Sequence, residues 1–174
     1  MDDLLSTLAH EFTRAPGPDA LIMILRLVGA AILSGLIGWE RETREHAAGL
    51  RTNMLIGLAA ATFAIIADGI VPQFQGESIR MDPMRLISSV TSGVAFLAAG
   101  LIVFSRGEVR GLTTGASIWL SAATGLAVGV GQWLVAVVAC LCGLTILSVV
   151  RRVENGMKRR HFAKRGAPRD RPEA

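Results

Sequence analysis

The feature that most constrains this chain is a run of 39 residues, from Leu112 to Val150, without a single charged side chain. A helix that crosses a bilayer needs about 20 mostly apolar residues, so the run is too long for one span and fits two. Gly129, Gly131 and Gln132 interrupt it near the middle. We therefore expect a fourth and a fifth transmembrane helix joined by a tight turn.

Three further apolar segments precede this run, and each is long enough to span a bilayer. Asp82 and Pro83 supply an N-cap residue and an N1 proline for the third of them. Only 18% of the 174 residues are charged, against about a quarter in a soluble domain. The sequence thus predicts an all-α protein, a polytopic membrane bundle of about five transmembrane helices. The three segments run from about Ala20 to Trp39, Met54 to Val71 and Met84 to Phe104.

The distribution of Lys and Arg predicts the orientation of the bundle. Nine of the 18 Lys and Arg residues lie in a tail after residue 150. With that tail in the cytoplasm, 14 basic residues lie inside and three outside, as the positive-inside rule requires. The predicted layout is an outer segment over 1–19, a transmembrane domain over 20–150 and a basic cytoplasmic tail over 151–174. No nucleic-acid-binding fold precedes the tail, so its expected partner is the lipid bilayer and not nucleic acid.

Small residues recur every four positions in the predicted fourth helix, at Ser117, Ser121, Gly125 and Gly129. Gly38 ends a similar series in the first helix. Small side chains let helices approach closely in lipid, so we expect tight packing along these faces. The ordinary glycine content of membrane helices is the alternative explanation. The sequence leaves two packing partners open, a helix of the same bundle or a second subunit of a homo-oligomer.

Two ionisable residues lie inside predicted spans, Arg26 in the first and Asp68 in the second. Their depths below the outer surface differ by only a few ångströms at about 1.5 Å per residue, so they can pair. Arg85, at the outer start of the third helix, can join them. Ionisable groups in a span are costly and indicate function, but a salt bridge that only holds helices together explains this cluster equally well.

Polar residues also gather in the two loops of the inner side. Charges of alternating sign usually indicate a solvated loop. However, Glu40 and Arg51 stand at the membrane ends of their helices, and Arg110 precedes two threonines at a helix start. We therefore predict that the loops face each other as a polar cap. Its members are Glu40, Arg41, Arg51, Thr52, Arg110, Thr113 and Thr114.

The sequence shows no arrangement of residues typical of an enzyme. The three histidines are scattered over an outer segment, an inner loop and the tail, so they lack the spacing of metal ligands. The serines have no His and Asp partners at a matching depth. We expect no catalytic residue, no metal site and no cofactor.

Four stretches resemble the N-terminal membrane domain of the MgtC/SapB family over roughly residues 20 to 150. They are GLIGWERE (35–42), AAGLRTNMLIGLAAATF (47–63), ISSVTSGVAFLAAGLI (87–102) and VRGLTTGASIWLSAATGLAVGVG (109–131). The resemblance implies a multi-pass protein of the bacterial inner membrane with about five spans. It also implies importance under magnesium limitation, acid stress or life inside host cells.

Two departures from the family pattern bear on what can be transferred. The third-helix glycine run appears here as GVAFLAAG, with alanines at positions 95 and 98. The virulence-associated branch also carries a soluble C-terminal domain, whereas this sequence ends in a short tail. The resemblance is therefore closest to the short, SapB-like members.

Two functions remain in competition. The first is a non-enzymatic regulator that binds other membrane proteins, among them the proton-translocating ATP synthase that the resemblance implies as a partner. The second is a small transporter or channel for magnesium or protons, with Asp68 and Arg26 along a polar path. The charge-free fourth and fifth helices favour the regulator, because conducting paths usually carry more intramembrane polar groups.

Overall fold

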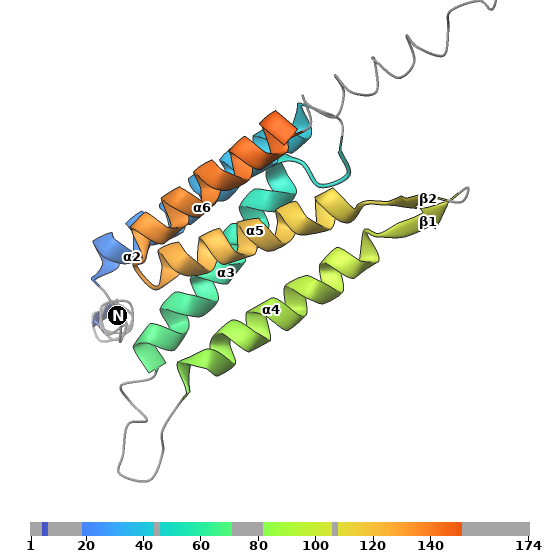
Figure 1. The fold of residues 1–174 in the computed structure, drawn as a ribbon. Coiled ribbons are helices and arrows are strands. Elements are labelled where there is room, and N and C mark those ends of the chain that lie inside the picture. The colour runs from blue at the N-terminus through green and yellow to red at the C-terminus, as the bar shows by residue number, and fades with distance from the viewer. Residues whose placement is uncertain (1–4, 7–18, 44–45, 71–81, 106–107, 151–174) are drawn as a thin grey trace, which may run out of the picture.

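The structure is a computed structural model and describes residues 5–6, 19–43, 46–70, 82–105 and 108–150. The predicted outer segment and basic tail lie almost wholly outside these residues. The described chain forms five α-helices, a short π-helical turn and one β-hairpin (Figure 1). In order these are α2 (Ala20–Glu42), α3 (Leu50–Ile70), α4 (Pro83–Gly100), β1 (Val103–Ser105), β2 (Glu108–Arg110), α5 (Leu112–Gly129), α6 (Trp133–Thr145) and η2 (Ile146–Val150).

Helices α2, α3 and α5 form the centre of the bundle, each in contact with the other two. Helix α6 lies along α2 and α5, while α4 lies at the edge and packs mainly on α5 (Figure 1). The buried cluster at the centre consists of small residues such as Ala30, Ala61 and Ala136 with Val128. Small side chains allow the close helix approach on which packing in lipid depends.

The ladder of small residues in α5 is buried inside the chain. Ser117, Ser121, Gly125 and Gly129 are all buried, and a Cβ on Gly125 would meet the backbone of Gly57 in α3. Gly38 approaches α3 as closely, since a Cβ there would lie 2.8 Å from the Cα atom of Leu50. The structure therefore places these tight contacts between helices of one bundle.

The outer surface of the bundle is apolar. Leu21, Phe96 and Leu134 are 79%, 86% and 77% exposed, and they come from three different helices. Soluble monomers rarely expose contiguous apolar surface on this scale, whereas lipid is the natural solvent for it. Helices α2 and α3 are also long and apolar enough to cross a membrane, and α4 and α6 supply shorter apolar helices.

Several local predictions are confirmed. Asp82 caps α4, with its carboxylate accepting a hydrogen bond of 2.9 Å from the amide of Met84, and Pro83 occupies the first turn. The charge-free run is divided between α5 and α6 at residues 130–132, where Gly131 has a φ of +82°.

The first inner loop is shorter than predicted. Helix α2 continues through Glu42 and α3 begins at Leu50, so Glu40, Arg41 and Arg51 are helical. A solvated loop was the wrong expectation for Arg41, which is 2% exposed in the last turn of α2. Glu40 and Arg51 stand near the ends of α2 and α3, where the sequence analysis places them.

The all-α prediction holds for most of the described chain, and one short hairpin departs from it. The third helix ends at Gly100 instead of Phe104, and the chain then forms an antiparallel hairpin in which Val103 pairs with Arg110. Gly111 follows the hairpin with a φ of +91°, and a Cβ there would collide with the carbonyl of Leu101. A glycine is therefore required where the hairpin returns the chain to α5.

Candidate functional site

The cluster predicted as the inner polar cap centres on Arg41, which is only 2% exposed at the end of α2. Its Nη2 atom donates a hydrogen bond of 3.0 Å to the hydroxyl oxygen of Thr114, in the first turn of α5. Glu40 is 9% exposed beside it. Because a buried guanidinium is costly without partners, this contact fixes the end of α2 against the start of α5.

The other residues of the predicted cap lie further out. Arg51, Arg110 and Thr113 are exposed, and Thr52 is half-buried. Arg110 pairs with Glu108 across 3.8 Å, with both side chains largely exposed. The structure thus joins the two inner segments through Arg41 and Thr114, while the remaining side chains surround this contact.

Glu42 closes the segment between α2 and α3. Its Oε2 atom accepts a hydrogen bond of 2.9 Å from the amide of Leu50, the first residue of α3. A Cβ on Gly49 would collide with the same carboxylate. Sequence analysis missed this role of Glu42. The spacing of eight residues between Glu42 and Leu50 could have indicated it.

Asn53 is the most important residue that sequence analysis missed. It is fully buried in α3, and its Nδ2 atom donates to the carbonyls of Ala48 at 3.1 Å and Gly49 at 2.8 Å. Its Oδ1 atom accepts a hydrogen bond of 2.7 Å from Ser121 of α5. The backbone carbonyl of Ser121 in turn accepts from Ser34 of α2 at 3.2 Å. These bonds connect all three central helices.

The polar cluster that the sequence assigns to the outer side is built on Arg26 of α2. Its Nη1 atom lies 3.3 Å from Asp68 of α3 and donates a hydrogen bond of 2.9 Å to the carbonyl of Gly129 at the end of α5. The side chain of Arg26 is 16% exposed and that of Asp68 is 53% exposed. Arg26 therefore joins three helices and also places a positive charge at the negative end of α5.

Arg85 does not join this pair. It is exposed in the first turn of α4, and the structure shows no ion pair between it and Asp68. Helix α4 packs mainly on α5 and makes a smaller contact with α3.

Arg26 is expected to matter more for stability than its partner Asp68. Asp68→Ala removes an exposed ion pair, for which we expect a loss below about 1 kcal/mol. Arg26→Ala also leaves the Gly129 carbonyl without its charged donor, so we expect a loss of about 2 kcal/mol. Thermal unfolding in detergent micelles measures both.

A charge exchange is the sharper test of this asymmetry. Arg26→Asp combined with Asp68→Arg restores the ion pair but not the donor to Gly129, so stability should recover only in part. Full recovery in the double variant would show that the ion pair alone accounts for the effect of Arg26.

The described residues contain no group of three or more His, Cys, Asp or Glu side chains placed to hold a metal ion. What they contain is a column of polar contacts along α5, from Thr114 through Ser121 to Gly129. Each contact joins α5 to another helix, so the column can position the helices relative to one another.

The MgtC family profile matches residues 27–156 of the chain. The chain belongs to the MgtC family. It is 37% identical over 131 residues to YhiD of Escherichia coli K12, an alignment that covers 75% of this chain and 61% of YhiD. It is also 40% identical over 125 residues to Protein MgtC of Brucella abortus, covering 72% of this chain and 50% of that protein.

A third MgtC family member, Protein MgtC of Salmonella typhimurium, is 39% identical over 127 residues, which cover 71% of this chain and 52% of the relative. The chain thus spans between half and about three-fifths of the length of these relatives. No solved structure matches it.

Proposed function

We propose that this MgtC family chain is a non-enzymatic regulator of the bacterial inner membrane. It binds other membrane proteins during adaptation to low magnesium, acid or related stress, and the proton-translocating ATP synthase is the partner that the family resemblance suggests. In this proposal α2 to α6 each span the membrane, with the N-terminus outside and the C-terminus in the cytoplasm. The observation that carries the proposal is the uncovered surface of α4.

Helix α4 differs from the central helices in that none of its described side chains is buried. Gly93, Phe96 and Gly100 share one face, because residues three and four positions apart lie together on a helix. No atom lies within 4 Å of a Cβ built on either glycine, and Phe96 is 86% exposed. Small residues with open space beside them suit close approach by another transmembrane helix.

A small cation transporter or channel is the second candidate, and the polar column along α5 is the observation that favours it. The name of YhiD from Escherichia coli, which proposes magnesium transport, points the same way. Against this, Asn53 and Ser121 hydrogen-bond each other and neighbouring backbone, as structural polar groups do.

Filling the open face of α4 should abolish partner binding without unfolding the chain. Gly93→Leu combined with Gly100→Leu introduces side chains where no atom stands, and leucine favours a helix more than glycine does. We expect normal expression and thermal stability together with a several-fold loss of ATP synthase subunits that co-purify from membranes. Quantitative mass spectrometry of the affinity-purified protein measures this loss.

Ala59→Leu on the exposed side of α3 is the matched control and should leave co-purification unchanged. Flux assays separate the two functions, and for a regulator we expect no magnesium or proton flux in proteoliposomes of the purified protein. Robust flux that disappears in Asp68→Asn would contradict the regulator and support the transporter.

A further inference from the structure

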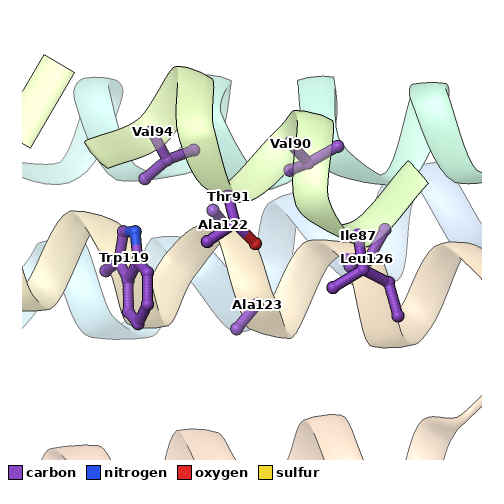
Figure 2. Close-up of a pocket in the computed structure, with 8 residues that line it drawn as sticks. All are labelled: Ile87, Val90, Thr91, Val94, Trp119, Ala122, Ala123 and Leu126. Atoms are coloured by element: carbon purple, nitrogen blue, oxygen red, sulfur yellow. The ribbon is translucent and has the colours of Figure 1, made fainter. Parts of the chain in front are cut away.

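Helices α4 and α5 enclose an apolar groove on the side of α4 opposite Gly93 and Gly100. One part, of about 110 Å³, lies between Ile87 and Thr91 of α4 and Trp119 and Leu126 of α5 (Figure 2). A second part, of about 300 Å³, continues toward the hairpin. Trp119 lines both parts, so the groove follows α5 from Leu112 to Leu126.

The groove is apolar, and small side chains make up most of the lining of its larger part. Ala95, Ala98 and Ala99 form one wall of its larger part, with Gly115 and Ala116 opposite. Two of these are the alanines that replace glycines of the family pattern in the third helix. A compact polar ligand would find few hydrogen-bonding groups here, whereas an extended hydrocarbon chain matches both the shape and the lining.

The hairpin end of the groove lies near Arg110, which forms an exposed ion pair with Glu108. Arg110 pairs in register with Val103, the residue after the groove-lining Ile102, and its side chain is 69% exposed. Helix α5 begins next to it with Gly111 as N-cap and no capping side chain. The first backbone amides of α5 therefore have no intrahelical acceptor, and the positive end of its dipole lies at the groove.

We propose that this groove binds an anionic phospholipid, with an acyl chain along Trp119 and the phosphate beside Arg110 and the start of α5. The hairpin suits a position at the membrane surface, since Val103, Phe104 and Val109 are exposed apolar residues that can enter the interface. Glu108 is the acid that faces Arg110. Their pair is exposed and spans 3.8 Å, and such pairs are weak enough for a phosphate to compete.

The occupant is a lipid and not a partner helix because none of the lining residues is charged, while Arg110 and the first amides of α5 lie together beyond the hairpin end of the groove. A transmembrane helix would need contact along the whole groove, whereas a phospholipid combines one apolar chain with one terminal negative charge. This site is independent of the proposed function, since the partner face of α4 contains Gly93, Phe96 and Gly100 and lies on its other side.

Fluorescence of Trp119 tests the proposal directly. Trp39→Phe with Trp133→Phe leaves Trp119 as the sole tryptophan of the chain's three. This protein is reconstituted into phosphatidylcholine bilayers with the same mole fraction of either brominated phosphatidylglycerol or brominated phosphatidylcholine. We expect phosphatidylglycerol to occupy the groove with about fivefold preference over phosphatidylcholine, because one basic residue near an anionic lipid provides about that much. Brominated phosphatidylglycerol should therefore quench the fluorescence of Trp119 more strongly than brominated phosphatidylcholine does.

Matched variants assign the effect to the groove. Arg110→Gln should remove the preference for phosphatidylglycerol, whereas Arg85→Gln at the opposite end of α4 should keep it. Ala116→Leu should reduce quenching by both lipids because it fills the groove, and Ala59→Leu should not. Equal quenching by the two brominated lipids, or a preference that survives Arg110→Gln, would overturn the proposal.

Discussion

Gly125→Ala is expected to prevent the chain from folding stably, although the change adds only one methyl group. A Cβ at this position would lie 2.6 Å from the Cα atom of Gly57 and 2.7 Å from its carbonyl carbon. Both atoms belong to the backbone of α3, so no side-chain rotation relieves the collision. The two central helices would have to move apart.

The expected cost exceeds the roughly 1–3 kcal/mol of ordinary overpacking, because separation of α3 from α5 also disrupts the Asn53–Ser121 hydrogen bond. Size-exclusion chromatography in detergent and circular dichroism should show aggregated or poorly helical protein. Gly93→Ala is the control, since open space surrounds that position and alanine should stabilise α4 by up to about 1 kcal/mol. Normal folding of Gly125→Ala would show that α3 and α5 do not cross as closely as described.

The helices could be predicted because their cause is local. A charge-free run, the caps at Asp82 and Pro83 and the glycines near residue 130 each act over a few residues of sequence. The proximity of Arg26 and Asp68 could also be predicted, because the fixed rise per residue of a helix gives the depth of each residue in its span. The further bond from Arg26 to Gly129 could not be predicted, since it depends on how α5 ends in three dimensions.

The features that sequence analysis missed all depend on tertiary contacts. Arg41 and Thr114 were both assigned to the predicted polar cap, but the burial of Arg41 and its hydrogen bond to Thr114 were not predicted. Val103 and Phe104 continue an apolar run and look like the end of a helix, but they pair with Arg110 and Val109 of the strand that follows. Asn53 follows Arg51 and Thr52 at the start of α3, so its position in the sequence gave no sign of burial.

Asn53→Ala is expected to produce the largest loss of stability that does not involve a backbone collision. The change removes three hydrogen bonds and leaves the carbonyl of Ala48 and the hydroxyl of Ser121 without this partner, while the carbonyl of Gly49 keeps its bond of 3.2 Å from the backbone amide of residue 53. An unpaired buried polar group costs about 1–3 kcal/mol, so we expect a total loss of about 3 kcal/mol or more. Unfolding in a mixed-micelle denaturation series measures it.

The loss of stability should be located at the start of α3, and it should be coupled to the effect of Ser121→Ala. Exchange of the backbone amide hydrogens should increase at residues 46–49, because Asn53 holds the carbonyls of Ala48 and Gly49 at the start of α3. Ser121→Ala should cost less alone and little more in the Asn53→Ala background, since its hydroxyl bonds to Asn53. Thr62→Ala is the control, because that hydroxyl is exposed and bonds only within its own helix, to Leu58. Additive effects of Asn53→Ala and Ser121→Ala would contradict the hydrogen bond between α3 and α5, and with it the role of Asn53 in joining the central helices.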